Sequence, residues 1–212
     1  MSKTIQTKDI DLRFLIDRFG IELVEDEAFF CEWKENLPDI SDSDKQLLDK
    51  VKAGYINLLN YPPLLEGAMV MSVLSPILFI GNFYLSPFYV RTEESVEVAT
   101  EDEEGAIVRG RIDTLVLKEQ LWVMVIESKK ASFSTEEGLA QILAYMLGNP
   151  NPDKPSYGTI ATGGSFVFVK LVMGNPPRYA LSKGFLTRNP GNELYDVLRV
   201  FKRLSQIAIS DG

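Results

Sequence analysis

Histidine is absent from this chain of 212 residues, and cysteine occurs only once, as Cys31. The absence of histidine excludes Ser-His-Asp and Cys-His catalysis, because both need an imidazole that titrates near neutral pH. Zinc sites built from His and Cys are excluded as well, since one cysteine cannot form them. Any bound metal must be held by oxygen, which favours magnesium, manganese or calcium. A lone cysteine forms no disulfide within the chain, so we expect a cytoplasmic protein.

Long apolar runs are also absent, because no stretch approaches the roughly 18 apolar residues of a membrane helix. The opening residues MSKTIQTKDIDLRF lack the basic, apolar and small-residue regions of a signal peptide. The motifs GxxxxGK(S/T) and GxGxxG do not occur. We therefore expect no membrane partner, and no nucleotide binding through those two motifs.

Acidic residues outnumber basic ones, with 30 Asp and Glu against 22 Lys and Arg, which gives a formal net charge of −8. Such a balance argues against a protein that coats nucleic acid without specificity, because that binding depends on cationic side chains. It does not exclude a protein that contacts a few phosphates through a local basic surface and a metal ion.

The hydrophobic pattern is helical in the first 60 residues, where Ser and Asp caps open an amphipathic helix over residues 41–60. A short buried helix is predicted over residues 64–75 and is expected to end at Pro76. Strands are predicted over 77–85, 88–101, 106–117 and 121–130, then a helix within 134–150, strands in 157–172 and 178–186, and a helix over 192–209.

This order predicts an α/β fold, namely a mixed central β-sheet flanked by helices. We expect residues 61–212 to form the core of that fold. Residues 1–60 are expected to form a helical N-terminal extension packed on the core.

Two neighbouring strand-like segments, RGRIDTLVL and LWVMVIESKK, bring charged residues together. The second segment is apolar on both alternating faces almost to its end, which is typical of a central strand covered on both sides. Period-two geometry puts its Glu127 and Lys129 on one face. A hairpin turn centred on Glu119 places residue 125 opposite Asp113, which makes Glu127 a diagonal neighbour of Asp113. Two carboxylates and an ammonium group should therefore meet at one edge of the sheet.

This combination suits hydrolysis of a phosphodiester, which is itself an anion. A divalent cation lowers the pKa of a bound water, so that hydroxide forms at neutral pH, and it neutralises the charge that builds up. Magnesium prefers carboxylate, water and phosphate oxygens. A lysine beside the water can orient or deprotonate it and stabilise the transition state.

Asp113 in the segment GRID, followed by Glu127-Ser128-Lys129, resembles the PD-(D/E)xK nuclease superfamily. The resemblance implies the restriction-endonuclease-like fold. Ile112 stands where the superfamily's name has a proline, and RecB-like branches commonly lack that proline as well.

Gln141 and Tyr145, on the next predicted helix, resemble the QxxxY element of RecB-like nucleases. In general appearance the chain is most similar to the N-terminal nuclease domain of type I restriction enzyme R subunits. The resemblance covers about residues 60–170 and includes the order helix, three-strand meander, helix, strand.

The resemblance implies that Asp113 and Glu127 ligate Mg2+ or Mn2+ and that the Ser128 backbone carbonyl adds an oxygen. Lys129 would be the catalytic lysine. Glu66 is the candidate for the acidic residue that many members carry in the helix before the sheet. Without the resemblance, Glu127 and Lys129 read as a surface ion pair, and Glu66 as an acid facing solvent at a helix end.

Gln141 and Tyr145 would support the lysine or touch DNA, although two residues one helical turn apart need no functional explanation. Arg109 and Arg111 lie on the same face of the predicted strand as Asp113 and could contact phosphate. Ion pairs with the EDEE cluster at residues 101–104 are the structural alternative for both arginines.

We therefore expect a Mg2+- or Mn2+-dependent DNA endonuclease that acts in restriction or repair. Cleavage of both strands would favour a homodimer. One alternative is a catalytically silent module that binds nucleic acid or a protein on the same fold. Another is a nuclease subunit that is active only with a separate helicase or specificity subunit.

Overall fold

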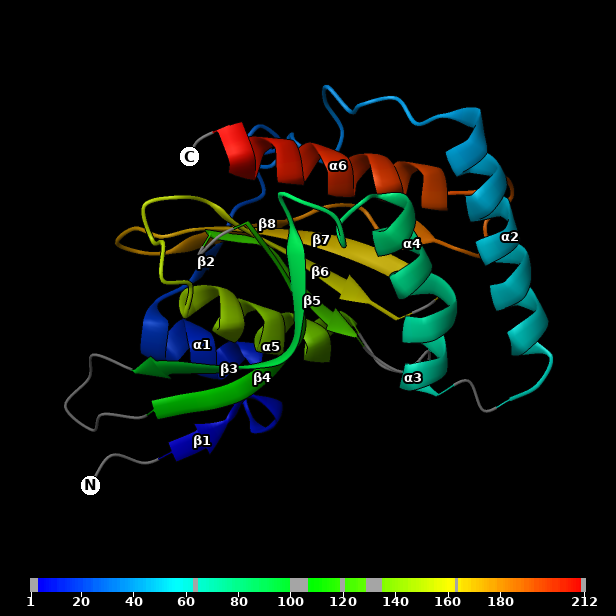
Figure 1. Cartoon of the computed structure of the whole chain (residues 1–212). Coiled ribbons are helices and arrows are strands. Elements are labelled where there is room, and N and C mark those ends of the chain that lie inside the picture. Colours follow the sequence, from blue (N-terminus) through cyan, green and yellow to red (C-terminus); the bar gives the residue numbers. More distant parts are fainter. Residues whose placement is uncertain are drawn as a thin grey trace.

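The structure, a computed structural model, describes residues 4–62, 65–99, 107–118, 121–128, 135–162 and 164–210. Its strands form one mixed sheet with helices on both faces (Figure 1). The strands are β1 (Thr4–Gln6), β2 (Glu22–Leu23), β3 (Tyr89–Ala99), β4 (Ile107–Lys118), β5 (Leu121–Ser128), β6 (Ser156–Ala161), β7 (Ser165–Val172), β8 (Arg178–Leu181) and β9 (Phe185–Leu186). The helices are η1 (Thr7–Asp9, 3-10), α1 (Leu12–Phe19), α2 (Asp42–Leu59), α3 (Glu66–Met69), η2 (Val70–Leu74, π), α4 (Ser75–Ile80), α5 (Thr135–Leu147) and α6 (Leu194–Ser210).

The nine strands follow the order β1-β4-β5-β6-β7-β8-β2, with β3 on β4 and β9 on β7. Strands β3, β4 and β5 form an antiparallel meander, and β6 runs parallel to β5. The predicted α/β class, with a mixed central sheet flanked by helices, is confirmed. The expected order of helix, three-strand meander, helix and strand is present in α4, β3–β5, α5 and β6.

Strand β4 carries two different strands on the edge opposite β3. Near its start it pairs in parallel with β1, up to Gln6 beside Arg109. Near its end it pairs antiparallel with β5, from Thr114 beside Ile126. Because β1 and β5 both run toward the middle of β4, their carboxyl ends approach each other there. Residues 110–113 lie between the two pairings, and this is where the candidate site forms.

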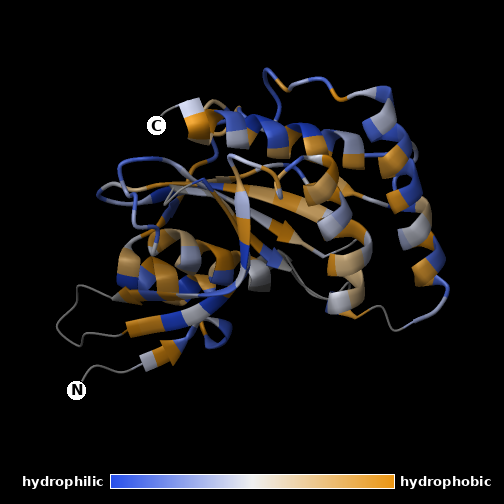
Figure 2. Ribbon diagram, in the orientation of Figure 1, coloured by the Kyte–Doolittle hydropathy of each residue, from blue (hydrophilic) through white to orange (hydrophobic). Residues whose placement is uncertain are grey.

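Helices cover the two faces of the sheet unequally. Helix α5 packs with α1 on one face, in a core that includes Leu143 and Val125. Helices α2, α4 and α6 lie on the other face, where Phe201 packs in the same core as Met124 and Ile126. Strand β5 thus gives alternate side chains to both cores, which confirms the prediction of a central strand. In Figure 2 the apolar residues of α6 lie on the side that faces the sheet.

The helices begin where polar side chains can cap free backbone N–H groups. The Ser41 hydroxyl accepts from the backbone N–H of Asp44 at 3.1 Å, and the Asp44 carboxylate accepts from the N–H of Ser41 at 3.2 Å, which is a capping box at the start of α2. Helix α1 begins after Asp11, whose carboxylate accepts from the N–H of Phe14. It ends at Gly20, whose φ of 64° lies in the left-handed region that glycine adopts readily. Among the described residues, no helix combines the length and the apolarity needed to cross a lipid bilayer.

The prediction that the first 60 residues are helical is correct only for α1 and α2. Strand β1 pairs with β4, and β2 pairs with Arg178 and Tyr179 of β8. The sheet therefore includes strands from both sides of the boundary predicted at residue 60. Strands of three and two residues are too short to carry a period-two pattern, so they left no signal in the sequence.

The prediction that Pro76 ends a helix and that residues 77–85 form a strand is wrong. The chain stays helical through α3, η2 and α4 as far as Ile80, and Pro76 lies in the first turn of α4. A proline there removes no required N–H bond, because the π-helical turn η2 has already changed the hydrogen-bond pattern. The buried residues keep helical spacing across the proline: Met69, Val73, Leu74, Ile77 and Leu78.

Candidate active site

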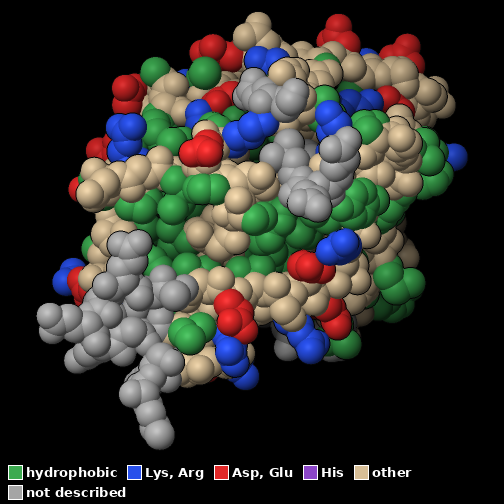
Figure 3. Space-filling model, turned by 60° about the vertical axis from the view of Figure 1, so that its left-hand side comes forward, with side chains coloured by type: hydrophobic (Ala, Val, Ile, Leu, Met, Phe, Trp, Pro, Cys, Tyr) green, Lys and Arg blue, Asp and Glu red, His purple; other side chains and the backbone are tan. Residues whose placement is uncertain are grey.

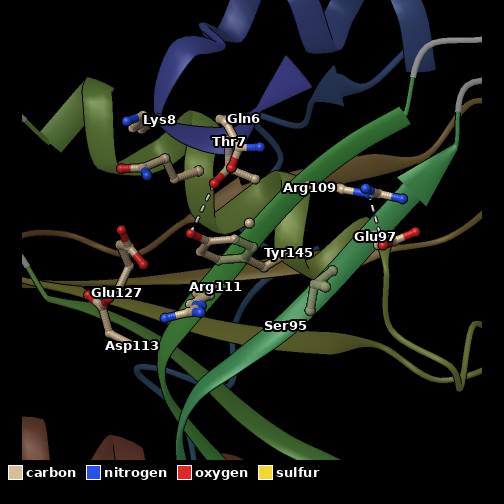
Figure 4. Close-up of a pocket in the computed structure, with 13 residues that line it drawn as sticks. Gln6, Thr7, Lys8, Ser95, Glu97, Arg109, Arg111, Asp113, Glu127 and Tyr145 are labelled. Atoms are coloured by element: carbon tan, nitrogen blue, oxygen red, sulfur yellow. Dashed lines mark hydrogen bonds and ion pairs between the residues drawn. The ribbon is translucent and has the colours of Figure 1, made fainter. Parts of the chain in front are cut away.

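A polar cavity of about 560 Å³ opens where β1 and β5 converge on β4. Its walls come from the end of β1 with η1, from β3 and β4, from the C-terminal end of β5 and from α5. Figure 4 shows the carboxylates of Asp113 and Glu127 side by side at one end of this cavity. Four of the residues expected at the site, Asp113, Glu127, Gln141 and Tyr145, line the cavity together with Arg111.

The pairing of β4 with β5 brings Asp113 closer to Glu127 than the sequence predicted. The expected pairing of residue 113 with residue 125 is wrong, because Val125 pairs with Leu115. The strands start from Lys118 beside Leu121, and a register shift between Val116 and Leu117 adds one more residue to β5. Continued by one residue past Thr114 and Ile126, this register sets Asp113 directly opposite Glu127. Directly opposite side chains on one face of a sheet have Cβ atoms about 5 Å apart.

Burial differs between the two carboxylates. Glu127 is only 1% exposed, while Asp113 is half-buried and faces the cavity. A buried carboxylate needs compensating positive charge or hydrogen bonds, because desolvation of an ionised acid is costly. Two acids held together in this way provide oxygen ligands suited to a hard divalent cation.

Helix α5 supplies the far wall through Gln141 and Tyr145, which are both buried and lie one turn apart. The Tyr145 hydroxyl shares a hydrogen bond of 3.2 Å with the Thr7 hydroxyl. Burial raises the pKa of the Tyr145 phenol above its usual value, and the nearby charges of Glu127 and Asp113 raise it further. Tyr145 is therefore a neutral hydroxyl group at physiological pH.

Gly110 lets the N-terminal segment approach β4. A Cβ atom at this position would lie 2.5 Å from Thr7 Cγ2 and 2.7 Å from Tyr145 Cε1. Real Cβ atoms do not come that close to other atoms, so any larger residue would push the two side chains apart. The glycine of the segment GRID is thus required by packing between β4, η1 and α5.

Arg109 and Arg111 point along the same face of β4 as Asp113. Arg109 pairs with Glu97 at 2.8 Å, and Arg111 pairs with Glu93 at 3.5 Å. The partners of both arginines are therefore glutamates of β3, and the EDEE cluster lies outside the described residues. Each pair is largely exposed, so we expect it to contribute less than about 1 kcal/mol to stability.

The backbone of β3 is strained beside the site. Glu93 has a φ of 55°, in the left-handed region, and interrupts the pairing of β3 with β4. Its neighbours Thr92 and Glu94 pair with Thr114 and Ile112, so Glu93 lies across from Asp113. Such a conformation costs a non-glycine residue about 1 kcal/mol or more. This strained residue and the interruption of the pairing therefore lie at the candidate site.

Among the described residues, one predicted site residue, Glu66, does not line the cavity. Lys129, the candidate catalytic lysine, lies outside the described residues. Glu66 opens α3 and is not part of the cavity wall. Among the residues that the structure describes, no three His, Cys, Asp or Glu side chains gather as a metal site, so Glu66 does not join Asp113 and Glu127. The Ser128 carbonyl ends β5 beside Ala161, and its metal-binding role stays a prediction.

The sequence analysis missed the cavity residues of β3, which are Ser95, Val96 and Glu97. It also missed three residues at the N-terminal end of the chain, Gln6, Thr7 and Lys8. They precede the first predicted helix, more than 100 residues from the GRID segment. Neither their spacing nor their composition marks them as part of a site. Only the parallel pairing of β1 with β4 brings them there.

The donor set fits a cation that takes oxygen ligands and keeps several waters. Two carboxylates and one backbone carbonyl are a common protein contribution to a Mg2+ or Mn2+ site, with water and substrate phosphate completing the shell. Comparison of the sequence with protein-family models and with curated proteins gives no match.

Proposed function

We propose that this chain is a metal-dependent nuclease that hydrolyses phosphodiester bonds of DNA. In this proposal it acts in the cytoplasm, in restriction or repair. The observation that carries the proposal is the meeting of Asp113 and Glu127 from paired strands in a polar cavity. The buried Gln141 and Tyr145 beside them add weight, since they lie at the positions that the resemblance to RecB-like nucleases implies.

The two acids argue for a cation because of charge. Asp113 and Glu127 would repel an anionic phosphodiester if nothing offset their charge. A bound Mg2+ or Mn2+ would supply that offset, activate the attacking water and polarise the phosphoryl oxygen. Asp113, Glu127 and the Ser128 carbonyl are the residues that would hold the ion.

Other residues would orient the substrate by hydrogen bonds and stabilise the charge that develops on its phosphate. Tyr145 stays neutral, so its hydroxyl can donate to an anionic oxygen without adding repulsion. Gln141 has both a donor and an acceptor to offer beside it. Lys129 follows Glu127 by two residues, and its ammonium group is our candidate for stabilising the charge that develops on phosphate.

A cleavage assay with Mg2+ or Mn2+ tests the proposal. We expect wild type to cut DNA and Asp113→Ala to be slower by about 100-fold or more, since Lewis-acid catalysis contributes several kcal/mol and 1.4 kcal/mol is tenfold. Lys129→Ala should lose activity to a similar degree. The control is Asp153→Ala, which removes an exposed acid that does not line the cavity.

Metal binding gives a second readout that does not depend on turnover. We expect Mn2+ to raise the melting temperature of wild type and to have much less effect on Asp113→Ala, because only the folded site binds the ion. Equal cleavage by wild type and Asp113→Ala, with equal stabilisation by Mn2+, would reject the site.

A second candidate function is a binding module without catalysis. The net charge of −8 favours it, as do the ion pairs that occupy Arg109 and Arg111. On the face drawn in Figure 3, Lys and Arg side chains are interspersed with Asp and Glu ones. This candidate predicts binding of DNA or a protein with no metal-dependent cleavage.

A third candidate is a nuclease subunit that needs a partner. Activity that appears only when a helicase or specificity subunit is added would identify it. A homodimer in solution would suit cleavage of both strands.

A further inference from the structure

The end of β1 and helix η1 form one wall of the candidate active site. Thr7 is 5% exposed, and its hydroxyl bonds to the Tyr145 hydroxyl at 3.2 Å. Its methyl group lies over Gly110, where a Cβ would leave no room for it. Since Thr7 is fixed between β4 and α5, the residue that follows it is held at the mouth of the cavity. That residue is Lys8.

Lys8 differs in its surroundings from the other two cations on the cavity wall. Arg109 and Arg111 are paired with Glu97 and Glu93 on β3. Lys8 is exposed, and it forms no ion pair with any residue in the part of the chain that the structure describes. A phosphate would have to compete with a glutamate for either arginine, whereas no acid among the described residues competes for Lys8.

The position of Lys8 also suits a phosphate contact. In Figure 4 it lies on the same side of the cavity as Glu127, and Arg109 with its partner Glu97 lies on the other side. If a divalent cation offset the charges of Asp113 and Glu127, Lys8 would remain as a positive charge on the wall that no described acid neutralises. A polyanionic strand entering the cavity would then be attracted to it.

We propose that Lys8 binds a backbone phosphate of the nucleic-acid substrate and so positions the strand against Asp113 and Glu127. This inference rests on the proposed nuclease function and adds a residue to its substrate-binding surface. In this role Lys8 is a substrate-binding residue, and Thr7, held by Tyr145 and Gly110, is the residue that positions it. A phosphate contact has a signature that a structural role lacks, because it adds to the salt dependence of binding, and removal of the contact lowers that dependence.

The experiment measures affinity and cleavage separately. Binding of a fluorescent DNA duplex is followed by anisotropy over a range of salt concentrations, with Ca2+ in place of Mg2+, and cleavage is followed with Mg2+. We expect Lys8→Ala to weaken binding roughly tenfold for all sequences and to reduce the slope of log K against log salt by about 1. Its KM should rise while kcat stays within about twofold of wild type.

Matched variants decide between the explanations. Lys50→Ala removes another exposed lysine, on α2 and away from the cavity, and should bind and cleave like wild type. Lys8→Arg should restore the salt slope. If wild type cleaves DNA and Lys8→Ala keeps wild-type affinity and slope, the Lys8 assignment is overturned while the nuclease stands. Binding without cleavage that still depends on Lys8 would support the phosphate contact and reject the nuclease. A wild type that neither binds nor cleaves would reject both.

Discussion

Tyr145 is the residue through which the site and the N-terminal segment depend on each other. Its ring packs against Gly110, its hydroxyl bonds to Thr7, and the charges of Glu127 and Asp113 act on it. One side chain of α5 therefore joins the wall that carries the acids to the wall that carries Lys8.

Tyr145 should make the stability of the protein fall at alkaline pH. Its folded-state pKa is raised above the ordinary value of 10.0, so above pH 10 the unfolded chain releases a proton that the folded chain keeps. The contribution of Tyr145 is thus present below that pH and is lost above it, by up to about 1.4 kcal/mol per pH unit. Tyr145→Phe removes the hydrogen bond to Thr7 and should lower the free energy of unfolding by about 1 kcal/mol at neutral pH. Its stability should then decline less steeply with rising pH than that of wild type.

Urea denaturation at a series of pH values between about 9 and 11.5 measures this difference. Tyr61→Phe is the control, because Tyr61 is 73% exposed. Parallel pH curves for wild type and Tyr145→Phe would contradict the prediction.

At the scale of elements, the candidate site exists because β4 is shared. Strand β1 pairs with its first residues and β5 with its last, on the same edge, and the gap between them exposes one side of residues 110–113. A strand paired along its whole length would leave no cavity there. The local packing at Gly110 keeps η1 in contact with α5 at this gap.

Gly110→Ala should therefore destabilise the protein by about 1–3 kcal/mol, since the new methyl group would overlap both Thr7 and Tyr145. Gly54→Ala is the matched control. A Cβ at Gly54, within α2, would meet no atom within 4 Å, and alanine is the better helix former by about 1 kcal/mol. Thermal denaturation should show the first variant melting lower and the second melting at or above wild type. Equal melting of both would show that Gly110 is not required by packing.

At the scale of the whole molecule, the segment between β2 and α2 is fastened to the sheet by a nearly buried ion pair. Lys170 of β7 pairs with Glu32 at 2.5 Å and donates to the Phe29 carbonyl at 2.8 Å. The side chains of Lys170 and Glu32 are 12% and 16% exposed. A pair so little exposed keeps the N-terminal segment on the sheet that β1 and β2 join.

Glu32→Ala should cost about 2–3 kcal/mol in the free energy of unfolding, less than the roughly 3–5 kcal/mol for a fully buried pair, because it leaves the Lys170 charge without its carboxylate. Replacing both residues with Met should cost less than the single change. Asp17→Ala breaks the exposed pair with Arg13 and should cost under about 0.5 kcal/mol. Urea denaturation of the four proteins tests the order. A loss for Glu32→Ala no larger than for Asp17→Ala would contradict it.

The sequence by itself determined the parts of the site that local periodicity controls. Alternation placed Glu127 at the end of a central strand and Asp113 on its hairpin partner, and helical spacing placed Gln141 beside Tyr145. The α/β class followed from the order of these segments. Such patterns depend on neighbours a few residues apart, so they can be read without the fold.

Only the tertiary structure decided how the segments meet. The shift between Val116 and Leu117 set the register, and the parallel pairing of β1 brought Thr7 and Lys8 to the cavity. Because its apolar side chains pack in the core, the chain stays helical beyond Pro76 to the end of α4, where the sequence predicted a strand. These outcomes depend on contacts between residues far apart in the chain. Such contacts exist only when the whole core has formed, so local sequence patterns do not predict them.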